Sequence, residues 1–179
     1  MPVTSRRMSL AIACAAVALG AGEARAEGPC AEGTRYRIVR SAKGGKPIAI
    51  AAAGERPVYG ELAFVELNGD GKQDVVLASA CIRSPADSVR LHRVYAACGA
   101  AAGGVEEYAL VFEEEELCAR AVKIEAQDAQ TTVKGVAWRD LRLTRTLPGK
   151  RCEQATQALQ FDGAQYRAGA RATAPCPKP

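Results

Sequence analysis

The chain has 179 residues, 48% of them hydrophobic, a formal net charge of +4 and a single histidine. That length is typical of one domain, since domains usually hold roughly 100–200 residues. Basic and acidic residues are nearly balanced and lie scattered among one another, which gives no argument for binding to nucleic acid.

Residues 1–26 form a predicted signal peptide. Arg6-Arg7 makes a positive start, residues 8–19 are apolar, and Ala24-Arg25-Ala26 has the small-x-small pattern of a cleavage site. The apolar run is shorter than the roughly 20 residues that a transmembrane helix needs, so we expect no stable membrane insertion after cleavage. The sequence therefore predicts export to the periplasm or the extracellular space, with a mature N-terminus at Glu27.

Beyond the leader, short alternating or continuous apolar segments between turn residues predict strands. The predicted strands cover residues 36–39, 48–53, 61–67, 74–80, 89–97, 131–147, 154–161 and 165–167. Residues 105–125 fit either two strands (108–112 and 121–124) joined by an acidic loop or a short helix near 105–120. We favour strands because the neighbouring segments are strands.

The fold class that follows is mainly β: a single antiparallel β-sheet domain, sandwich or barrel-like, over residues 27–171. The remaining residues, 172–179, form a predicted proline-rich tail. No low-complexity segment or internal linker divides the chain.

The mature chain keeps six cysteines, and an even number in an exported domain indicates up to three disulfides. They are Cys30, Cys81, Cys98, Cys118, Cys152 and Cys176. A hairpin about Asp162-Gly163 would bring Cys152 and Cys176 together. Cys81 follows one strand and Cys98 ends the next, which places them at opposite ends of a hairpin. We therefore prefer Cys81 with Cys118, and Cys30 with Cys98. A zinc cluster is the disfavoured alternative, since no CxxC pair exists.

The segment FVELNGDGKQDVVLASA, residues 64–80, carries oxygen-bearing side chains at alternate positions. Calcium takes six to eight oxygen ligands, and a tight loop supplies them by turning alternate side chains inward. Glycines within the loop permit the positive backbone angles that such a turn requires. The segment predicts a calcium site whose ligands are Glu66, Asn68, Asp70, the Lys72 backbone carbonyl and Asp74.

This loop resembles those of FG-GAP/VCBS-type repeats, whose pattern is close to D-x-[DN]-x-D-G-x-x-D before a short apolar strand. Asn68, Asp70, Gly71 and Asp74 match that pattern, while Glu66 stands where the family has aspartate. The resemblance covers only about twenty residues and implies an ion site, because one copy cannot build a propeller. The alternative is a plain Asn-Gly/Asp-Gly hairpin turn, which leaves the carboxylates of the loop without a counter-charge.

Other residues give weaker indications. His92 falls on the strand face opposite Tyr95 and is predicted to be exposed, and residues 113–116, four glutamates, are predicted to form a solvated acidic rim. No segment carries the pattern of a Ser-His-Asp hydrolase or argues for a glycosidase carboxylate pair. The sequence therefore favours a protein that is not an enzyme.

The leading hypothesis is an exported binding or accessory domain, stabilised by disulfides and one calcium ion, with a protein or a surface glycan as its partner. A secreted inhibitor or effector is the first alternative, for which residues 81–85, CIRSP, are the candidate loop. A calcium-stabilised hydrolase is the second.

Overall fold

The computed structural model describes residues 28–31, 33–40, 47–83, 88–101, 103–118, 121–147 and 152–176. The predicted leader, its cleavage point, and Ser84 and Pro85 of the candidate inhibitor loop lie outside these residues. All regular secondary structure in the described part of the chain is β-strand, and every strand pair is antiparallel. The predicted mainly-β antiparallel fold is confirmed.

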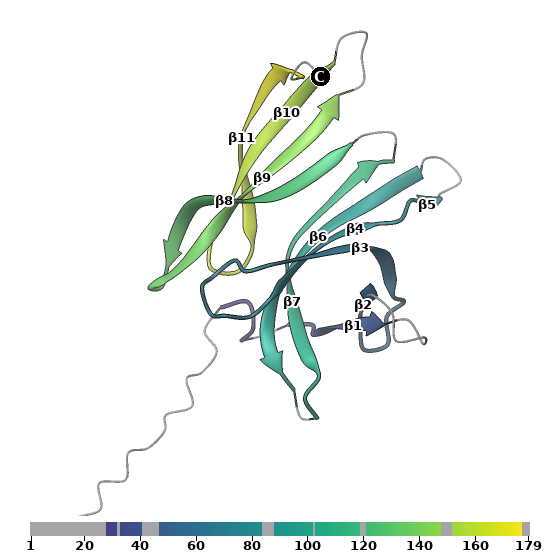
Figure 1. The fold of residues 1–179 in the computed structure, drawn as a ribbon, viewed down its shortest axis with the longest axis vertical. Helices are drawn as coiled ribbons and strands as arrows, with labels where there is room; N and C mark the ends of the chain where they lie inside the picture. The colour runs from purple at the N-terminus through teal and green to yellow at the C-terminus, as the bar shows by residue number, and fades with distance from the viewer. Residues whose placement is uncertain are drawn as a thin grey trace, which may run out of the picture.

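A closed six-stranded barrel forms the first half of the fold (Figure 1). Its strands, in the order in which they pair, are β1 (Tyr36–Arg40), β2 (Pro47–Ala52), β3 (Val58–Val65), β4 (Asp74–Ser79), β6 (Ser88–Ala100) and β7 (Glu106–Leu117). Pairing of β4 with β6, and of β1 with β7, closes the barrel. The short β5 (Ile82–Arg83) pairs with the first residues of β6.

A four-stranded sheet forms the second half of the fold and packs against the barrel (Figure 1). Its strands follow one another as a meander of β8 (Val122–Val133), β9 (Val136–Leu147), β10 (Glu153–Phe161) and β11 (Tyr166–Pro175). Pairing of β11 with β10 extends to Pro175, opposite Glu153. Residues 172–175, which the sequence analysis assigned to the tail, are therefore part of the sheet.

Strand β6 lies between two hydrophobic cores and is covered on both faces. Tyr95 and Ala97 belong to the core inside the barrel. Val94 and Ala96 belong to a second core that also contains Leu141 of β9 and aromatic residues of the four-stranded sheet. Because this second core draws residues from both halves, the barrel and the sheet bury apolar surface against each other.

The segment between residues 105 and 125 forms strands rather than a helix. Strand β7 spans residues 106–117, and β8 begins at Val122. Pairing with β6 along nearly the whole of β7 explains this outcome, because the ladder satisfies its backbone groups and buries Tyr108, Val111 and Phe112.

Three disulfides join the six cysteines in the predicted pairs, with Cα–Cα distances of 5.4, 5.9 and 5.3 Å for Cys30–Cys98, Cys81–Cys118 and Cys152–Cys176. The first ties the N-terminal segment to the end of β6, and the second joins residues that follow β4 and β7. The third closes the open end of the β10–β11 hairpin, where the Cys176 N–H donates to the Cys152 carbonyl at 3.0 Å. The preferred pairing is confirmed.

Candidate functional site: the acidic loop and its surroundings

The acidic loop, residues 66–73, connects β3 to β4 at one end of the barrel. Gly69 and Gly71 adopt φ angles of 70° and 77°, a left-handed conformation that costs glycine little. These two positions let the chain reverse within a few residues, as the sequence predicted from the glycines.

The side chains of the loop fold back onto its own backbone. The Asn68 Oδ1 accepts from the Asp70 N–H at 3.2 Å, and the Asp70 Oδ1 accepts from the Lys72 N–H at 2.9 Å. The Glu66 Oε1 accepts from the Gly71 N–H at 2.8 Å. Three loop N–H groups are thus satisfied by three of the side chains that were predicted as calcium ligands.

Asp74, the last predicted ligand, turns into the protein interior. Its side chain is completely buried, and its two oxygens accept the N–H groups of Leu67 and Ala97, each at 2.7 Å. Ala97 lies on β6, so this carboxyl group joins the acidic loop to a strand 23 residues further along the chain. Burial raises the pKa of Asp74 to about 6, although the two backbone hydrogen bonds act in the opposite direction.

Within the part of the chain that the structure describes, no three His, Cys, Asp or Glu side chains lie together so as to hold a metal ion. Glu66 and Asn68 each use one oxygen in a backbone hydrogen bond and keep further acceptor capacity, whereas the second oxygen of Asp70 lies 3.4 Å from the Lys72 ammonium. Both oxygens of Asp74 are directed at backbone N–H groups. Calcium binding at this loop therefore stays a prediction.

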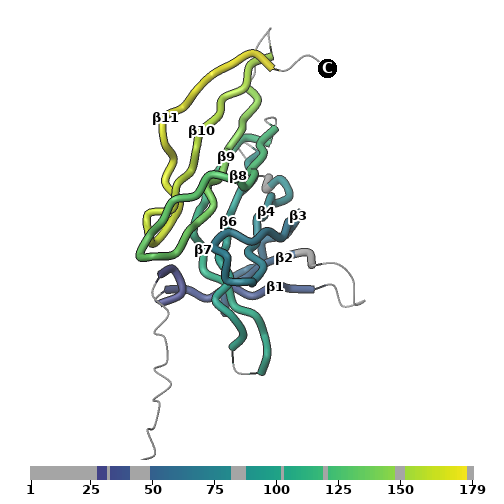
Figure 2. The backbone as a smooth tube through the Cα atoms, turned by 60° about the vertical axis from the view of Figure 1, so that its left-hand side comes forward, coloured from purple at the N-terminus to yellow at the C-terminus, as the bar shows by residue number. Residues whose placement is uncertain are grey.

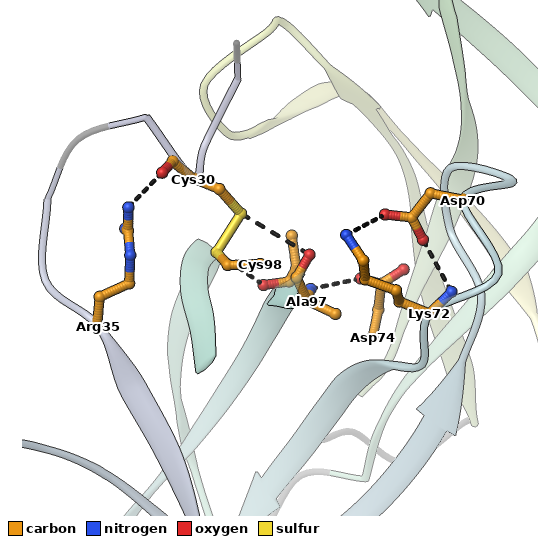
Figure 3. Close-up of a disulfide and its surroundings, with 8 residues drawn as sticks. Cys30, Arg35, Asp70, Lys72, Asp74, Ala97 and Cys98 are labelled. Atoms are coloured by element: carbon orange, nitrogen blue, oxygen red, sulfur yellow. Dashed lines mark hydrogen bonds and ion pairs between the residues drawn. A yellow bond between two sulfur atoms is a disulfide. The ribbon is translucent and has the colours of Figure 1, made fainter. Parts of the chain in front are cut away.

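Lys72 extends from the acidic loop toward the Cys30–Cys98 disulfide (Figure 3). Its ammonium Nζ lies 3.4 Å from the Asp70 Oδ2. That distance is longer than the roughly 2.7–2.9 Å of a strong charge-assisted hydrogen bond, so Asp70 holds the ammonium loosely. The ammonium group approaches Gly99, where an added Cβ would stand 3.7 Å from it. A lysine of the loop thus stands at the edge of the space beside the disulfide.

A cavity of about 280 Å³ opens beside this disulfide. It lies where the N-terminal residues 28–30, the acidic loop and the end of β6 meet the β8–β9 and β10–β11 turns. Figure 2 shows the N-terminal residues, in purple, close to the tips of those two hairpins. The wall includes Trp138, which stacks on Phe161 with ring centroids 3.9 Å apart.

A buried ion network joins the barrel to the four-stranded sheet at another place. Arg145 of β9 is 6% exposed and binds Glu114 and Glu116 of β7, the latter at 3.2 Å from its Nε. Its Nη1 also donates to the Gln157 Oε1 at 2.6 Å. The prediction of a solvated acidic rim over residues 113–116 is therefore wrong for Glu116, which is 8% exposed. Phe112, Glu114 and Glu116 lie at every second position of β7 and therefore on one face of the strand. The apolar Phe112 on that face was the feature of the sequence that could have indicated burial of Glu116.

His92 is 3% exposed, so the prediction of an exposed histidine is also wrong. The prediction took the Tyr95 face of β6 as the only buried face, whereas the opposite face lies against the four-stranded sheet. Burial lowers the pKa of His92, and the nearby Arg90 charge lowers it further.

Comparison with protein-family models, with curated proteins and with solved structures gives no match. Among the described residues, no helix has the length and apolar character needed to cross a membrane.

Proposed function

We propose that this chain is an exported, non-enzymatic β-domain that serves as a binding or accessory protein in the periplasm or outside the cell. The observation that carries the proposal is the pairing of all six cysteines beyond the predicted leader into three disulfides. Disulfides of this kind persist in oxidising compartments and are rare in the cytosol. The signal-peptide pattern of residues 1–26 points to the same compartment.

The surroundings of the titratable side chains support a role other than catalysis. The single histidine is enclosed between the barrel and the sheet, and Arg145 engages Glu114 and Glu116. Asp74 is buried under two backbone hydrogen bonds. A general acid or base must reach the proton that it transfers, and these groups face the protein interior.

The proposal includes one calcium ion at the acidic loop, held by Glu66, Asn68, Asp70 and the Lys72 carbonyl, with Asp74 behind them. Support comes from the residue types and their spacing, and from the acceptor capacity that the Glu66 and Asn68 side chains keep. The ion would add stability to a loop that the backbone hydrogen bonds already shape.

Expression of the full chain in a host with an oxidising periplasm tests export. We expect periplasmic protein that begins at Glu27 and has no free thiol, read from intact mass and non-reducing peptide mapping. Protein that keeps residues 1–26, or free thiols at Cys152 and Cys176, would overturn the proposal. A pull-down from the native envelope fraction, with reduced and alkylated protein as the control, then addresses the protein or glycan partner.

A secreted inhibitor is the second candidate, and the Cys81–Cys118 disulfide favours it. That bond anchors the start of the candidate loop over residues 81–85 to the end of β7. An inhibitor needs such a braced loop. Arg83→Ala should then abolish capture of a protease, whereas the accessory-domain function predicts no effect of this change on partner capture.

A further inference from the structure

We propose that a cavity between the barrel and the first residues of β8 binds a small neutral alcohol or phenol through His92. The cavity holds about 250 Å³ and is lined by residues of β3, β4, β6 and β8. Since each water takes roughly 30 Å³ of the liquid, the space equals roughly eight waters, which suits one ring or a short chain with a single polar group. The proposal goes beyond the proposed function, which assigns the chain a protein or glycan partner.

The floor of the cavity is a row of side chains on the outer face of the barrel. Ala78 of β4 pairs with Glu61 of β3 on one side and with His92 of β6 on the other, and all three line the cavity. Directly opposed residues of an antiparallel sheet place their side chains on the same face, roughly 4.5–5.5 Å apart. The single methyl group of Ala78 therefore leaves a gap between the Glu61 and His92 side chains.

The next row of the barrel and the facing strand of the sheet make the rest of the lining largely apolar. Ala63 of β3 and Val76 of β4 pair with each other and line one side. Val122 and Ile124 line the side formed by β8, and both pack against the core that joins the barrel to the sheet. Ligand pockets combine such apolar walls with a few polar groups that fix the orientation of the ligand.

His92 is the polar side chain that the cavity leaves without a partner. It is 3% exposed, and within the described part of the chain its imidazole forms no hydrogen bond. Its neighbour on β7, Glu114, is engaged by Arg145. Buried polar groups in proteins are nearly always hydrogen-bonded, because an unpaired one costs free energy. A ligand that brings a hydrogen-bonding group to His92 would remove this cost.

The state of the imidazole favours a neutral hydroxyl compound. Burial and the charge of Arg90 lower the pKa of His92, although the two nearby glutamates of β7 act in the opposite direction. A neutral imidazole has one donor and one acceptor nitrogen, and a hydroxyl group can pair with either. An ionised ligand would bury its charge with no counter-charge from His92. Glu61 and Lys123, also in the lining, carry opposite charges, and Lys123 already pairs with Glu125 at 2.6 Å.

Fluorine NMR with three probes, para-fluorophenol, para-fluorotoluene and para-fluorobenzoate, tests the proposal. The probes share one ring and differ in the group that would face His92, which is a hydroxyl, a methyl or a carboxylate. The disulfide-bonded exported protein, without a histidine tag, is titrated near neutral pH in chelator. We expect saturable binding of fluorophenol and an affinity about tenfold lower for fluorotoluene, which is the scale of one hydrogen bond. Fluorobenzoate should bind more weakly than fluorotoluene.

Three variants locate the site. His92→Phe keeps a ring but removes both nitrogens, so it should weaken fluorophenol binding about tenfold and leave fluorotoluene binding unchanged. Ala78→Leu should abolish binding of both probes by filling the cavity. Ala174→Leu is the matched control, because Ala174 is an exposed strand alanine on β11 that does not line the cavity. Circular dichroism spectra and melting curves that match the wild type verify the fold of each variant.

The wild-type protein supplies a second measurement that needs no variant. His92 is the only histidine of the chain, so its ring signals in a proton–carbon NMR spectrum need no further assignment. We expect these signals to shift with fluorophenol and to saturate at the same concentration as the fluorine signal.

An absent or non-saturable response to fluorophenol overturns the proposal, as do equal affinities for fluorophenol and fluorotoluene. Tighter binding of fluorobenzoate than of fluorotoluene overturns the neutral ligand class. Full binding in Ala78→Leu, or His92 signals that stay unchanged at saturation, would place the probe elsewhere and overturns the site. These failures are separable from a failure of the proposed function, because export and disulfide formation are read by mass without any ligand.

Discussion

Two aspartates of this protein each accept two backbone N–H groups and differ in their electrostatics. Asp74, the first residue after the acidic loop, accepts the N–H groups of Leu67 and Ala97, both at 2.7 Å. In the β10–β11 turn, Asp162 accepts the N–H groups of Ala164 and Gln165, both at 2.9 Å. The pKa of Asp74 is raised to about 6, while the pKa of Asp162 is lowered to about 2.

Burial explains the difference between the two carboxyl groups. Asp74 is fully buried, and the loss of hydration outweighs its two hydrogen bonds, with Asp70 and Glu66 adding negative charge nearby. The Asp162 side chain is 38% exposed, keeps most of its hydration, and accepts from the Arg167 Nε at 2.8 Å in addition to the two backbone bonds. Hydrogen bonds act to lower the carboxyl pKa at both sites, and burial is the larger effect only at Asp74.

The two carboxyl groups also connect different lengths of chain. Asp162 binds residues two and three positions away, whereas Asp74 reaches Ala97 on another strand. Loss of Asp162 therefore disturbs one turn, and loss of Asp74 disturbs the contact between the acidic loop and β6.

Replacement of Asp74 should have the largest effect. Asp74→Ala leaves two buried N–H groups without an acceptor, so near pH 4 we expect a loss of about 2–5 kcal/mol in the free energy of unfolding. At roughly 2–4 °C per kcal/mol, the melting temperature should fall by about 10 °C. Urea unfolding in chelator measures the loss. A loss no greater than that of Asp162→Ala would show that the two turns are equivalent.

The pH dependence of this loss should sharpen the comparison. The folded pKa of Asp74 lies above its ordinary value of 3.8, so between about pH 4 and pH 6 the native state binds more protons than the unfolded state. The contribution of Asp74 is therefore full below about pH 4 and falls as the pH rises, by about 2–3 kcal/mol by pH 7.

The depressed pKa of Asp162 reverses the sign, so its stabilisation is present above about pH 4 and is lost as the pH falls toward 2. The difference in unfolding free energy between the wild type and each alanine variant, measured from pH 3 to pH 7, should thus slope in opposite directions. Parallel slopes would contradict the assignment of burial as the cause.

Calcium should act on the acidic loop alone. At a calcium concentration about 100 times the dissociation constant, binding adds roughly 2.7 kcal/mol, which raises the melting temperature by several degrees. Magnesium should do much less, because it gives up its water reluctantly. Asp70→Ala should abolish the shift and Asp162→Ala should keep it. If neither calcium nor chelator changes the melting temperature of the wild type or of the two variants, the loop is a hydrogen-bonded turn without an ion.

The smallest effect is expected for Asp162→Ala, even at neutral pH, where the contribution of this carboxylate is fully present. Water can replace the lost acceptor and solvent screens the charge at this exposed turn, so we expect about 1–2 kcal/mol. Chemical denaturation at pH 7 measures it. A larger loss would mean that the β10–β11 turn contributes to the fold beyond its own residues.

Local pattern was sufficient to predict most strands. Hairpin geometry predicted the Cys152–Cys176 disulfide directly and led to the other two pairs by excluding a bond between Cys81 and Cys98. Local pattern could not predict closure of the barrel by the β4–β6 and β1–β7 pairings. The alternation of apolar and polar residues in a strand does not indicate which strand it pairs with. The alternation of side chains along β6 likewise distinguishes the two faces of the strand but does not show what covers each face. For that reason His92 was wrongly predicted to be exposed.

Within the candidate site, the turn and its glycines followed from the sequence, whereas the inward direction of Asp74 did not. Residue spacing treats Asp74 as one more loop oxygen, yet its acceptor role depends on the position of Ala97, which only the tertiary fold fixes. The cavity beside the disulfide has the same origin, since five separate segments meet there.

The most direct test of the comparison is a carboxyl carbon NMR titration of Asp74 and Asp162 in the disulfide-bonded protein, with chelator present. The alanine variants assign the two resonances. Our account predicts midpoints of about 6 for Asp74 and about 2 for Asp162. A midpoint for Asp74 at or below its ordinary value of 3.8 would contradict it, because backbone hydrogen bonds would then outweigh burial at this site.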